Sequence, residues 1–227
     1  MSIRLIIYDL DGTLIDSRCD IANAVNWALR ELGLPELAME EISSFVGHGV
    51  TNLLRGVLAA ALSKRTSAVQ MSDALLERSV RIYRARYAEH LLDETVLYTS
   101  VRDVLEHFKG RRQAVITNKP EGFSRRILEG LGIVHYFFKI IGGDQAFQKK
   151  PSAEPVLEIV KAAQVKISEA VLVGDSAVDI ETGKNAGIKT VAMTYGFGSP
   201  KEIEKSAPDF MFDDFRKLIR CPIFSSS

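Results

Sequence analysis

Short apolar runs, separated by segments with helical spacing, form the main pattern of this chain. Each run is too short for a helix and is rich in β-branched or aromatic residues, which favours buried strands at 5–8, 114–117, 138–141, 171–173 and 190–193. Amphipathic helical patterns separate the last four runs, at 124–131, 154–163 and 180–186. Because strands that alternate with helices pair in parallel through right-handed crossovers, the sequence predicts a doubly wound α/β core.

One long segment interrupts this alternation. Residues 57–109 contain neither glycine nor proline, and apolar positions follow helical spacing around 21–32, 53–61 and 75–83. A structureless loop of this length would be unusual in a compact domain. We therefore expect residues 17–92 to form a helical cap domain that is inserted into a core made of residues 1–16 and 93–227.

Composition limits the class of protein. Of the 227 residues, 46% are hydrophobic and 26% are charged, which is typical of a globular protein. The 29 basic and 29 acidic residues cancel, so no net field attracts nucleic acid or an anionic membrane. The two cysteines suit a reducing compartment, and the apolar run at the N-terminus is too short for a signal peptide or a membrane span. We expect a cytoplasmic monomer or homodimer that binds neither nucleic acid nor membranes.

Polar residues follow the predicted strands at the points where the strands end. They are Asp9 and Asp11 after the first strand, Thr117 and Asn118 after the second, Lys150 after the third, and Asp175 and Asp179 after the fourth. In open α/β sheets, ligands bind beyond the carboxyl ends of the strands. These side chains are therefore expected to share one site.

The residue types at this edge indicate the chemistry. Clustered carboxylates without histidine or cysteine are hard oxygen ligands that suit Mg²⁺, and a divalent cation would offset their mutual repulsion. Lys150, Thr117 and Asn118 add a cation and hydrogen-bond donors, which together favour an anion such as phosphate. A carboxylate in such a cluster can also attack phosphorus and form an aspartyl phosphate.

The same residues resemble the four motifs of the haloacid dehalogenase superfamily, in the same order. The motifs here are Asp9-Leu10-Asp11-Gly12-Thr13-Leu14, Thr117, Lys150-Pro151 and Gly174-Asp175-Ser176-x-x-Asp179. The likeness spans nearly the whole chain and includes a helical cap inserted after the first motif. Further segments are similar to phosphoglycolate phosphatases and their near relatives, namely Asp16-Ser17, 20–22, 32–35 and Phe45-Val46-Gly47-His48-Gly49-Val50.

The resemblance implies a catalytic role for individual residues. Asp9 would be the nucleophile, and Asp11 would be the general acid for the leaving oxygen and then the base for water. Lys150 would neutralise charge on Asp9 and on the phosphate. Mg²⁺ would be held by the carboxylates of Asp9 and Asp175, the backbone carbonyl of Asp11, and Asp179 directly or through a water. Asp179 has the alternative role of anchoring its own helix.

The resemblance also implies the substrate contacts. Gly12, Thr117, Asn118 and Lys150 would bind the phosphate, and Gly47 and His48 of the cap would contact the rest of the substrate. A turn that only joins two cap helices is the alternative interpretation of Gly47 and His48.

The implied function is Mg²⁺-dependent hydrolysis of a small phosphorylated metabolite, with 2-phosphoglycolate expected first. Asp11 argues against a dehalogenase, which needs neither an acid at that position nor a metal. A phosphonate-cleaving relative would need a Schiff-base lysine in the cap, where Lys64 is the only lysine. A pyrophosphatase, a nucleotidase and a sugar-phosphate phosphatase or mutase remain open alternatives. A binding protein that has lost catalysis is disfavoured because no motif position is degenerate.

Overall fold

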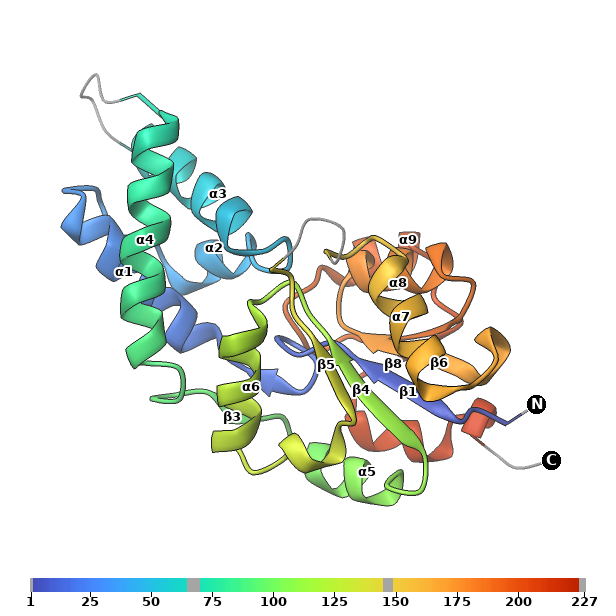
Figure 1. Cartoon of the computed structure of the whole chain (residues 1–227). Helices are drawn as coiled ribbons and strands as arrows, with labels where there is room; N and C mark the ends of the chain where they lie inside the picture. Colours follow the sequence, from blue (N-terminus) through green and yellow to red (C-terminus); the bar gives the residue numbers. More distant parts are fainter. Residues whose placement is uncertain (1, 65–69, 145–148, 225–227) are drawn as a thin grey trace. The chain divides into compact units, whose positions relative to one another are not determined.

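The computed structural model describes residues 2–64, 70–144 and 149–224 (Figure 1). Its contacts divide the chain into two compact units, one formed by Met1–Asp16 with Val96–Ser227 and the other by Ser17–Thr95. We call the first unit the core and the second the cap. The second boundary follows Thr95 rather than residue 92, because the backbone N–H groups of Glu94 and Thr95 donate to the Asp20 carboxylate of the cap, at 3.1 and 2.9 Å.

The core is built on a six-stranded parallel sheet with the order β5-β4-β1-β6-β7-β8. Its strands are β1 (Leu5–Tyr8), β4 (Arg112–Ile116), β5 (Lys139–Ile141), β6 (Ala170–Gly174), β7 (Lys189–Met193) and β8 (Phe210–Phe212). Leu5 lies between Arg112 and Ala170, so β1 pairs on both sides and the strand order reverses there. This is the predicted doubly wound topology, and it brings the loops after β1, β4 and β6 to one edge.

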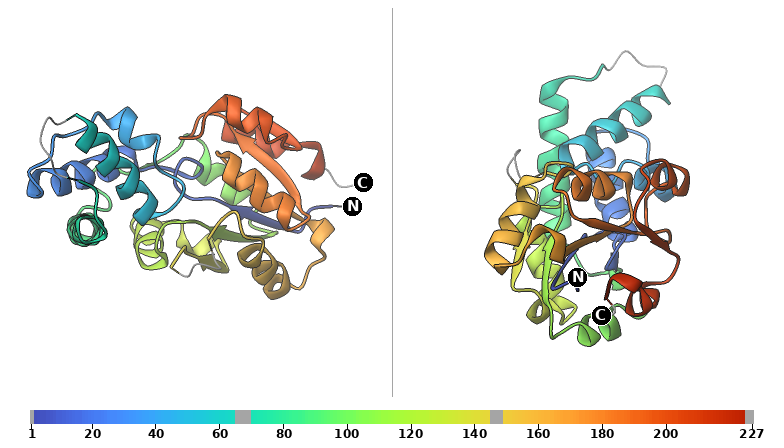
Figure 2. Two further views of the ribbon diagram at one scale, coloured as in Figure 1. Left: turned by 90° about the horizontal axis from the view of Figure 1, so that it is seen from above. Right: turned by 90° about the vertical axis from the view of Figure 1, so that its right-hand side faces the viewer.

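Helices cover both faces of this sheet (Figure 2). They are α5 (Val101–His107), α6 (Glu121–Gly130), α7 (Glu154–Ala163), α8 (Ala177–Asn185) and α9 (Pro200–Lys205), with 3₁₀ turns at Val134–Tyr136, Ile167–Glu169, Phe215–Arg220 and Pro222–Phe224. On one face, Val156 and Ile159 of α7 pack among the alternating apolar residues of β1, β4 and β6. On the other, Gln113 of β4 donates to the Leu105 carbonyl of α5, at 3.0 Å. The polar loops at the strand ends therefore rest on a rigid, three-layered scaffold.

A short antiparallel ribbon pairs the core residues that precede the cap in the sequence with the core residues that follow it. Ile15 and Asp16 of β2 (Ile15–Asp16) pair with Leu97 and Val96 of β3 (Val96–Leu97). Two-residue strands carry no detectable alternation, so the sequence pattern does not predict them.

The cap consists of helices, as expected, within its described residues. They are α1 (Arg18–Glu31), α2 (Met39–Ser43), α3 (Val50–Ser63) and α4 (Asp73–Glu89). Helix α4 packs against both α1 and α3, and the rings of Tyr83 and Tyr87 stack with centroids 5.3 Å apart. The cap therefore has an apolar interior of its own.

Among the described residues, the model has no helix that combines the length and the apolar character needed to cross a membrane.

Candidate active site

The loop after β1 presents the first two carboxylates. The Asp9 N–H donates to the Val173 carbonyl of β6 at 2.9 Å, which fixes Asp9 where the strand ends. The chain then turns at Gly12, whose φ of +89° favours glycine and whose N–H donates to the Ile15 carbonyl. A Cβ at Gly12 would lie 2.2 Å from Asp175 Oδ2. Gly12 thus lets the loop pass directly against Asp175, and its predicted contact with phosphate remains a prediction.

Lys150 joins two of the carboxylates. Its Nζ lies 2.6 Å from Asp9 Oδ1 and 2.6 Å from Asp179 Oδ1, and all three side chains are buried. Burial disfavours the charged lysine, but Asp179 and Asp9 outweigh that effect and raise the pKa of Lys150 above its usual value. The two carboxylates therefore favour the charged form of Lys150.

Asn118 holds the main chain of Lys150. Its Nδ2 donates to the Lys150 carbonyl at 3.2 Å, and its Oδ1 accepts from the Lys150 N–H at 2.8 Å. These bonds place the lysine with respect to β4. They support a positioning role for Asn118, and direct contact with phosphate remains a prediction.

Thr117 is buried where β4 ends, with its N–H bonded to the Ile141 carbonyl of β5 at 3.0 Å. Its hydroxyl oxygen accepts from the Lys119 N–H at 3.2 Å. The hydroxyl proton can therefore still be donated to an incoming oxygen, as expected for a phosphate-binding threonine.

Asp179 both caps a helix and contacts Lys150. Its Oδ2 accepts from the N–H and hydroxyl of Ser176, at 3.0 and 2.6 Å, while Ser176 Oγ accepts from the Asp179 N–H. This reciprocal pair is a capping box at the start of α8. The other oxygen, Oδ1, is the one that meets Lys150. The structure therefore shows the helix-anchoring role of Asp179, and its contact with Mg²⁺ remains a prediction.

Asp175 is held by residues that the sequence interpretation did not assign to the site. Its Oδ1 accepts from the Thr13 hydroxyl at 2.9 Å, and its Oδ2 accepts from the Phe197 N–H at 2.7 Å. The Tyr195 hydroxyl donates to the Thr13 carbonyl at 2.7 Å, so the loop after β7 closes onto the loop after β1. The Tyr195-Gly196-Phe197-Gly198 sequence after a strand is the signal that could have indicated this.

The carboxylates at this edge carry more negative charge than Lys150 offsets. Burial, followed by repulsion from Asp179, raises the pKa of Asp175 to about 7, although the bonds from Phe197 and Thr13 oppose the shift. Burial also raises the pKa of Asp9 well above its usual value; Lys150 opposes this shift, and Asp179 and Asp175 add to it. The site therefore favours an additional cation.

The donor set fits Mg²⁺. Asp9, Asp175 and Asp179 each place one carboxylate oxygen within 4.8 Å of the others. Three buried oxygen donors with excess negative charge suit a hard divalent cation. The Asp11 side chain lies outside this set, and its predicted contact through the backbone carbonyl remains a prediction.

Asp11 is instead bound by Lys119, which the sequence interpretation missed. Lys119 Nζ lies 2.6 Å from Asp11 Oδ1, and Lys119 is only 8% exposed. The signal was present, because Lys119 directly follows Thr117 and Asn118 at the end of β4. The site therefore has two buried lysines, each paired with an acidic residue of the loop after β1.

Gly47 and His48 belong to the cap, in the loop that precedes α3. Gly47 has a φ of +112°, and the exposed His48 accepts through its carbonyl from Asn52 Nδ2 at 3.1 Å. Their contact with substrate remains a prediction.

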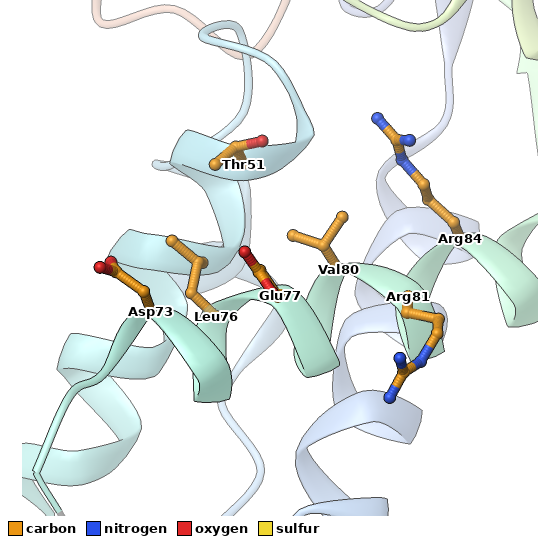
Figure 3. Close-up of a pocket in the computed structure, with 7 residues that line it drawn as sticks. All are labelled: Thr51, Asp73, Leu76, Glu77, Val80, Arg81 and Arg84. Atoms are coloured by element: carbon orange, nitrogen blue, oxygen red, sulfur yellow. The ribbon is translucent and has the colours of Figure 1, made fainter.

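A groove of about 560 Å³ lies along α4 in the cap (Figure 3). It is lined by Thr51, Asp73, Leu76, Glu77, Val80, Arg81 and Arg84. Figure 3 shows Leu76 between Asp73 and Glu77 toward the start of α4, and Val80 between Glu77 and the two arginines further along the helix. This lining contains none of the predicted site residues.

Comparison with known proteins identifies the family of this chain. A family model for haloacid dehalogenase-like hydrolases matches residues 6–193. The phosphoglycolate phosphatase of Pseudomonas putida is 39% identical over 219 residues, which are 95% of this chain and 78% of that protein. The phosphoglycolate phosphatase of Vibrio parahaemolyticus is 36% identical over 219 residues, covering 96% of this chain and 95% of that protein.

Solved structures show the same fold. The crystal structure of a predicted phosphoglycolate phosphatase from Haemophilus somnus has a TM-score of 0.91 and 31% sequence identity, covering 97% of this chain and 98% of that one. The match extends over both units of the chain. This chain therefore belongs to the haloacid dehalogenase-like hydrolase family.

Proposed function

We propose that this protein is a Mg²⁺-dependent phosphoric monoester hydrolase whose substrate is 2-phosphoglycolate. The observation that carries the proposal is the buried set of Asp9, Lys150, Asp175 and Asp179, in which a cation and a candidate metal site both lie beside Asp9. The names of the relatives support the substrate class, since the phosphatases of Pseudomonas putida and Vibrio parahaemolyticus are both named for phosphoglycolate.

The reaction would proceed in two displacements. A carboxylate oxygen of Asp9 attacks phosphorus, the ester P–O bond breaks, and Asp11 gives a proton to the departing oxygen. Asp11 then takes a proton from water, which attacks the aspartyl phosphate and releases inorganic phosphate and the free Asp9 carboxylate. Atoms and charge balance, because the alcohol leaves with the proton that Asp11 recovers from water.

Positioning and charge neutralisation carry most of the catalysis in phosphoryl transfer. Lys150 reduces the repulsion between Asp9 and the incoming phosphate, and the Thr117 hydroxyl can donate to a phosphoryl oxygen. Mg²⁺ held by Asp9, Asp175 and Asp179 would stabilise the negative charge that develops on the phosphoryl oxygens. The buried ion pairs hold these groups in place before substrate arrives.

We further propose that the protein acts in the cytoplasm as a monomer or homodimer, without nucleic-acid or membrane partners. The balanced charge of the chain supports this.

A substrate panel with a nucleophile variant tests the function. Phosphate release is measured with 2-phosphoglycolate, pyrophosphate, nucleotides and sugar phosphates, in Mg²⁺ and in chelator. We expect the highest kcat/KM with 2-phosphoglycolate, no turnover in chelator, and a loss of at least about three orders of magnitude in kcat for Asp9→Asn. Asp103→Asn removes an exposed carboxylate paired with Arg216 and serves as the control. A higher kcat/KM for pyrophosphate or a nucleotide would assign one of those activities instead.

A further inference from the structure

Two loops of the core hold Asp175 through both of its carboxylate oxygens. From the loop after β1, the Thr13 hydroxyl donates to Oδ1 at 2.9 Å. From the loop after β7, the N–H groups of Phe197 and Gly198 donate to Oδ2 at 2.7 and 3.3 Å. In the described part of the chain, Oδ1 accepts no hydrogen bond other than that from Thr13. Because a carboxylate oxygen has two lone pairs, Oδ1 retains one that can bind a cation.

The loop after β7 passes directly against Asp175. A Cβ at Gly196 would lie 2.4 Å from the Gly12 carbonyl oxygen, and a Cβ at Gly198 would lie 2.1 Å from the Asp175 carbonyl oxygen. Both contacts are with backbone atoms, which cannot move aside as the end of a flexible side chain can. The glycines of this loop are therefore explained by the close approach that lets the loop donate to Oδ2.

The Tyr195 hydroxyl connects the two loops. It donates to the Thr13 carbonyl at 2.7 Å, and the Thr13 hydroxyl in turn donates to Asp175. The Tyr195 ring packs against the ring of Tyr98, with centroids 4.5 Å apart. Burial, followed by the charge of Asp175, raises the pKa of Tyr195 above its usual value. The hydroxyl therefore keeps its proton for the Thr13 carbonyl.

The turn that carries Thr13 also has main-chain bonds of its own. The N–H groups of Thr13, Leu14 and Ile15 donate to the Leu10 carbonyl, at 3.3, 2.9 and 3.1 Å. These bonds determine the shape of the turn. The bond from Tyr195 determines where the Thr13 peptide lies relative to the loop after β7. Without it, the Thr13 hydroxyl loses one of the contacts that place it beside Asp175 Oδ1.

We propose that Tyr195 is a positioning residue for the metal site and that it acts through Thr13. By holding the Thr13 carbonyl, Tyr195 places the Thr13 hydroxyl on Asp175 Oδ1 and so orients the remaining lone pair of that oxygen. The inference rests on the proposed function, because it concerns the Mg²⁺ site of the same reaction. Removing a group that orients a metal ligand typically changes metal affinity about 10–100-fold.

Calorimetric titration of the full chain with Mg²⁺ alone, without substrate, tests the inference. Thr13→Val removes the hydroxyl that contacts Asp175 and should weaken Mg²⁺ binding at least about 10-fold. Thr13→Ser keeps a hydroxyl and should stay within about 3-fold of wild type. Tyr195→Phe deletes only a hydroxyl and acts one contact further away, so we expect it to weaken binding at least about 3-fold.

A double-mutant cycle separates positioning through Thr13 from a general structural effect. In the Thr13→Val background no hydroxyl is left to be placed, so adding Tyr195→Phe should change Mg²⁺ affinity by less than about 1.5-fold. Tyr136→Phe is the matched control, because it deletes another half-buried tyrosine hydroxyl, which donates to Glu106 at 3.1 Å. This control should bind Mg²⁺ as wild type does.

Wild-type Mg²⁺ affinity in Tyr195→Phe would overturn the inference. An equal loss of affinity in the Thr13 and Thr13→Val backgrounds would also overturn it, because Tyr195 would then not act through the Thr13 hydroxyl. If Tyr195→Phe does not fold, equal affinities of Thr13→Ser and Thr13→Val overturn the inference. These outcomes leave the proposed function standing as long as wild type binds Mg²⁺ and requires it for turnover. A wild type that does neither would overturn the proposed function and the inference together.

Discussion

Gly12 lies so close to Asp175 that a Cβ on it would be 2.2 Å from Oδ2. Its φ of +89° adds backbone strain for any other residue. We expect Gly12→Ala to lower the free energy of unfolding by about 2–4 kcal/mol and to abolish turnover, because either the loop or Asp175 must move. Denaturant unfolding and phosphate release measure the two effects.

Gly33→Ala is the matched control for Gly12. Gly33 also has a positive φ, of +66°, but nothing lies within 4 Å of its Cβ position. Gly33→Ala should therefore lower the free energy of unfolding only by the backbone strain of about 1–2 kcal/mol, and it should keep its activity. Equal losses in both variants would contradict the role given to the close approach.

Asp11 and Asp175 should differ in their effect on metal binding. The side chain of Asp11 is paired with Lys119, whereas Asp175 belongs to the three-carboxylate cluster. We expect Asp11→Asn to slow turnover at least about 100-fold while Mg²⁺ affinity stays within about 3-fold of wild type. Asp175→Asn should weaken Mg²⁺ binding at least about 10-fold. Titration calorimetry with Mg²⁺ alone measures both affinities, and equal losses would count against the proposed ligand set.

The metal-free protein should lose stability as the pH rises. In the folded state the pKa of Asp175 is about 7 instead of 3.8, and that of Asp9 is also raised. Between these values the folded state binds a proton that the unfolded state has released, so the free energy of unfolding falls with rising pH. In chelator we expect this fall from about pH 5 to about pH 8, and a smaller one in Asp175→Asn.

Asp209 provides a control of opposite sign. Partial burial raises its pKa. Hydrogen bonds from Lys189 and the Thr190 N–H lower the pKa by a larger amount, so it lies below 3.8. The stability that ionised Asp209 contributes is present above the pKa of this residue in the unfolded state. It is lost as the pH falls through the lower pKa of the folded state. Asp209→Asn should therefore leave the slope between about pH 5 and about pH 8 unchanged. A flat wild-type profile in chelator would show that the carboxylates are not protonated in the folded state.

Ser176 should connect helix capping with catalysis. Its hydroxyl bonds Asp179 Oδ2 at 2.6 Å, while Asp179 Oδ1 contacts Lys150. Ser176→Ala should lower stability by about 1 kcal/mol and also lower kcat, since Asp179 loses a partner that orients it. Ser72→Ala removes the cap of α4, where Ser72 Oγ accepts from Leu75, and should lower stability alone. Unchanged kcat in Ser176→Ala would limit its hydroxyl to a structural role.

The central strands and the site carboxylates could be predicted because local sequence determines them. Leu5–Tyr8 is a fully buried run, and the acidic residues follow such runs directly. Helix α7 spans Glu154–Ala163, as its spacing predicts. Helices α6 and α8 begin three residues earlier than their predicted patterns, with Glu121-Gly122-Phe123 and Ala177-Val178-Asp179 as their first residues. Periodicity detects the repeating buried positions of a helix and not the residue at which the helix begins.

The missed features depend on contacts between distant segments. Phe210–Phe212 is a half-buried edge strand whose pairing with β7 defines it. Lys119 and Asp11 are separated by 108 positions, and Thr13 and Asp175 by 162. No periodicity in either segment encodes these pairs. They follow only when the strand order is known, because that order decides which loops meet.

The Asp20 carboxylate accepts hydrogen bonds from the main chain of Glu94 and Thr95, so the first helix of the cap is tied to its last residues. On the core side, the pairing of Ile15 with Leu97 holds the flanking segments together in the same way. The inserted residues therefore begin and end at neighbouring points, and the two segments that connect them to the core are bonded to each other. Such a segment can be lengthened, shortened or exchanged during evolution without changing the distance between the two points at which it joins the hydrolytic core.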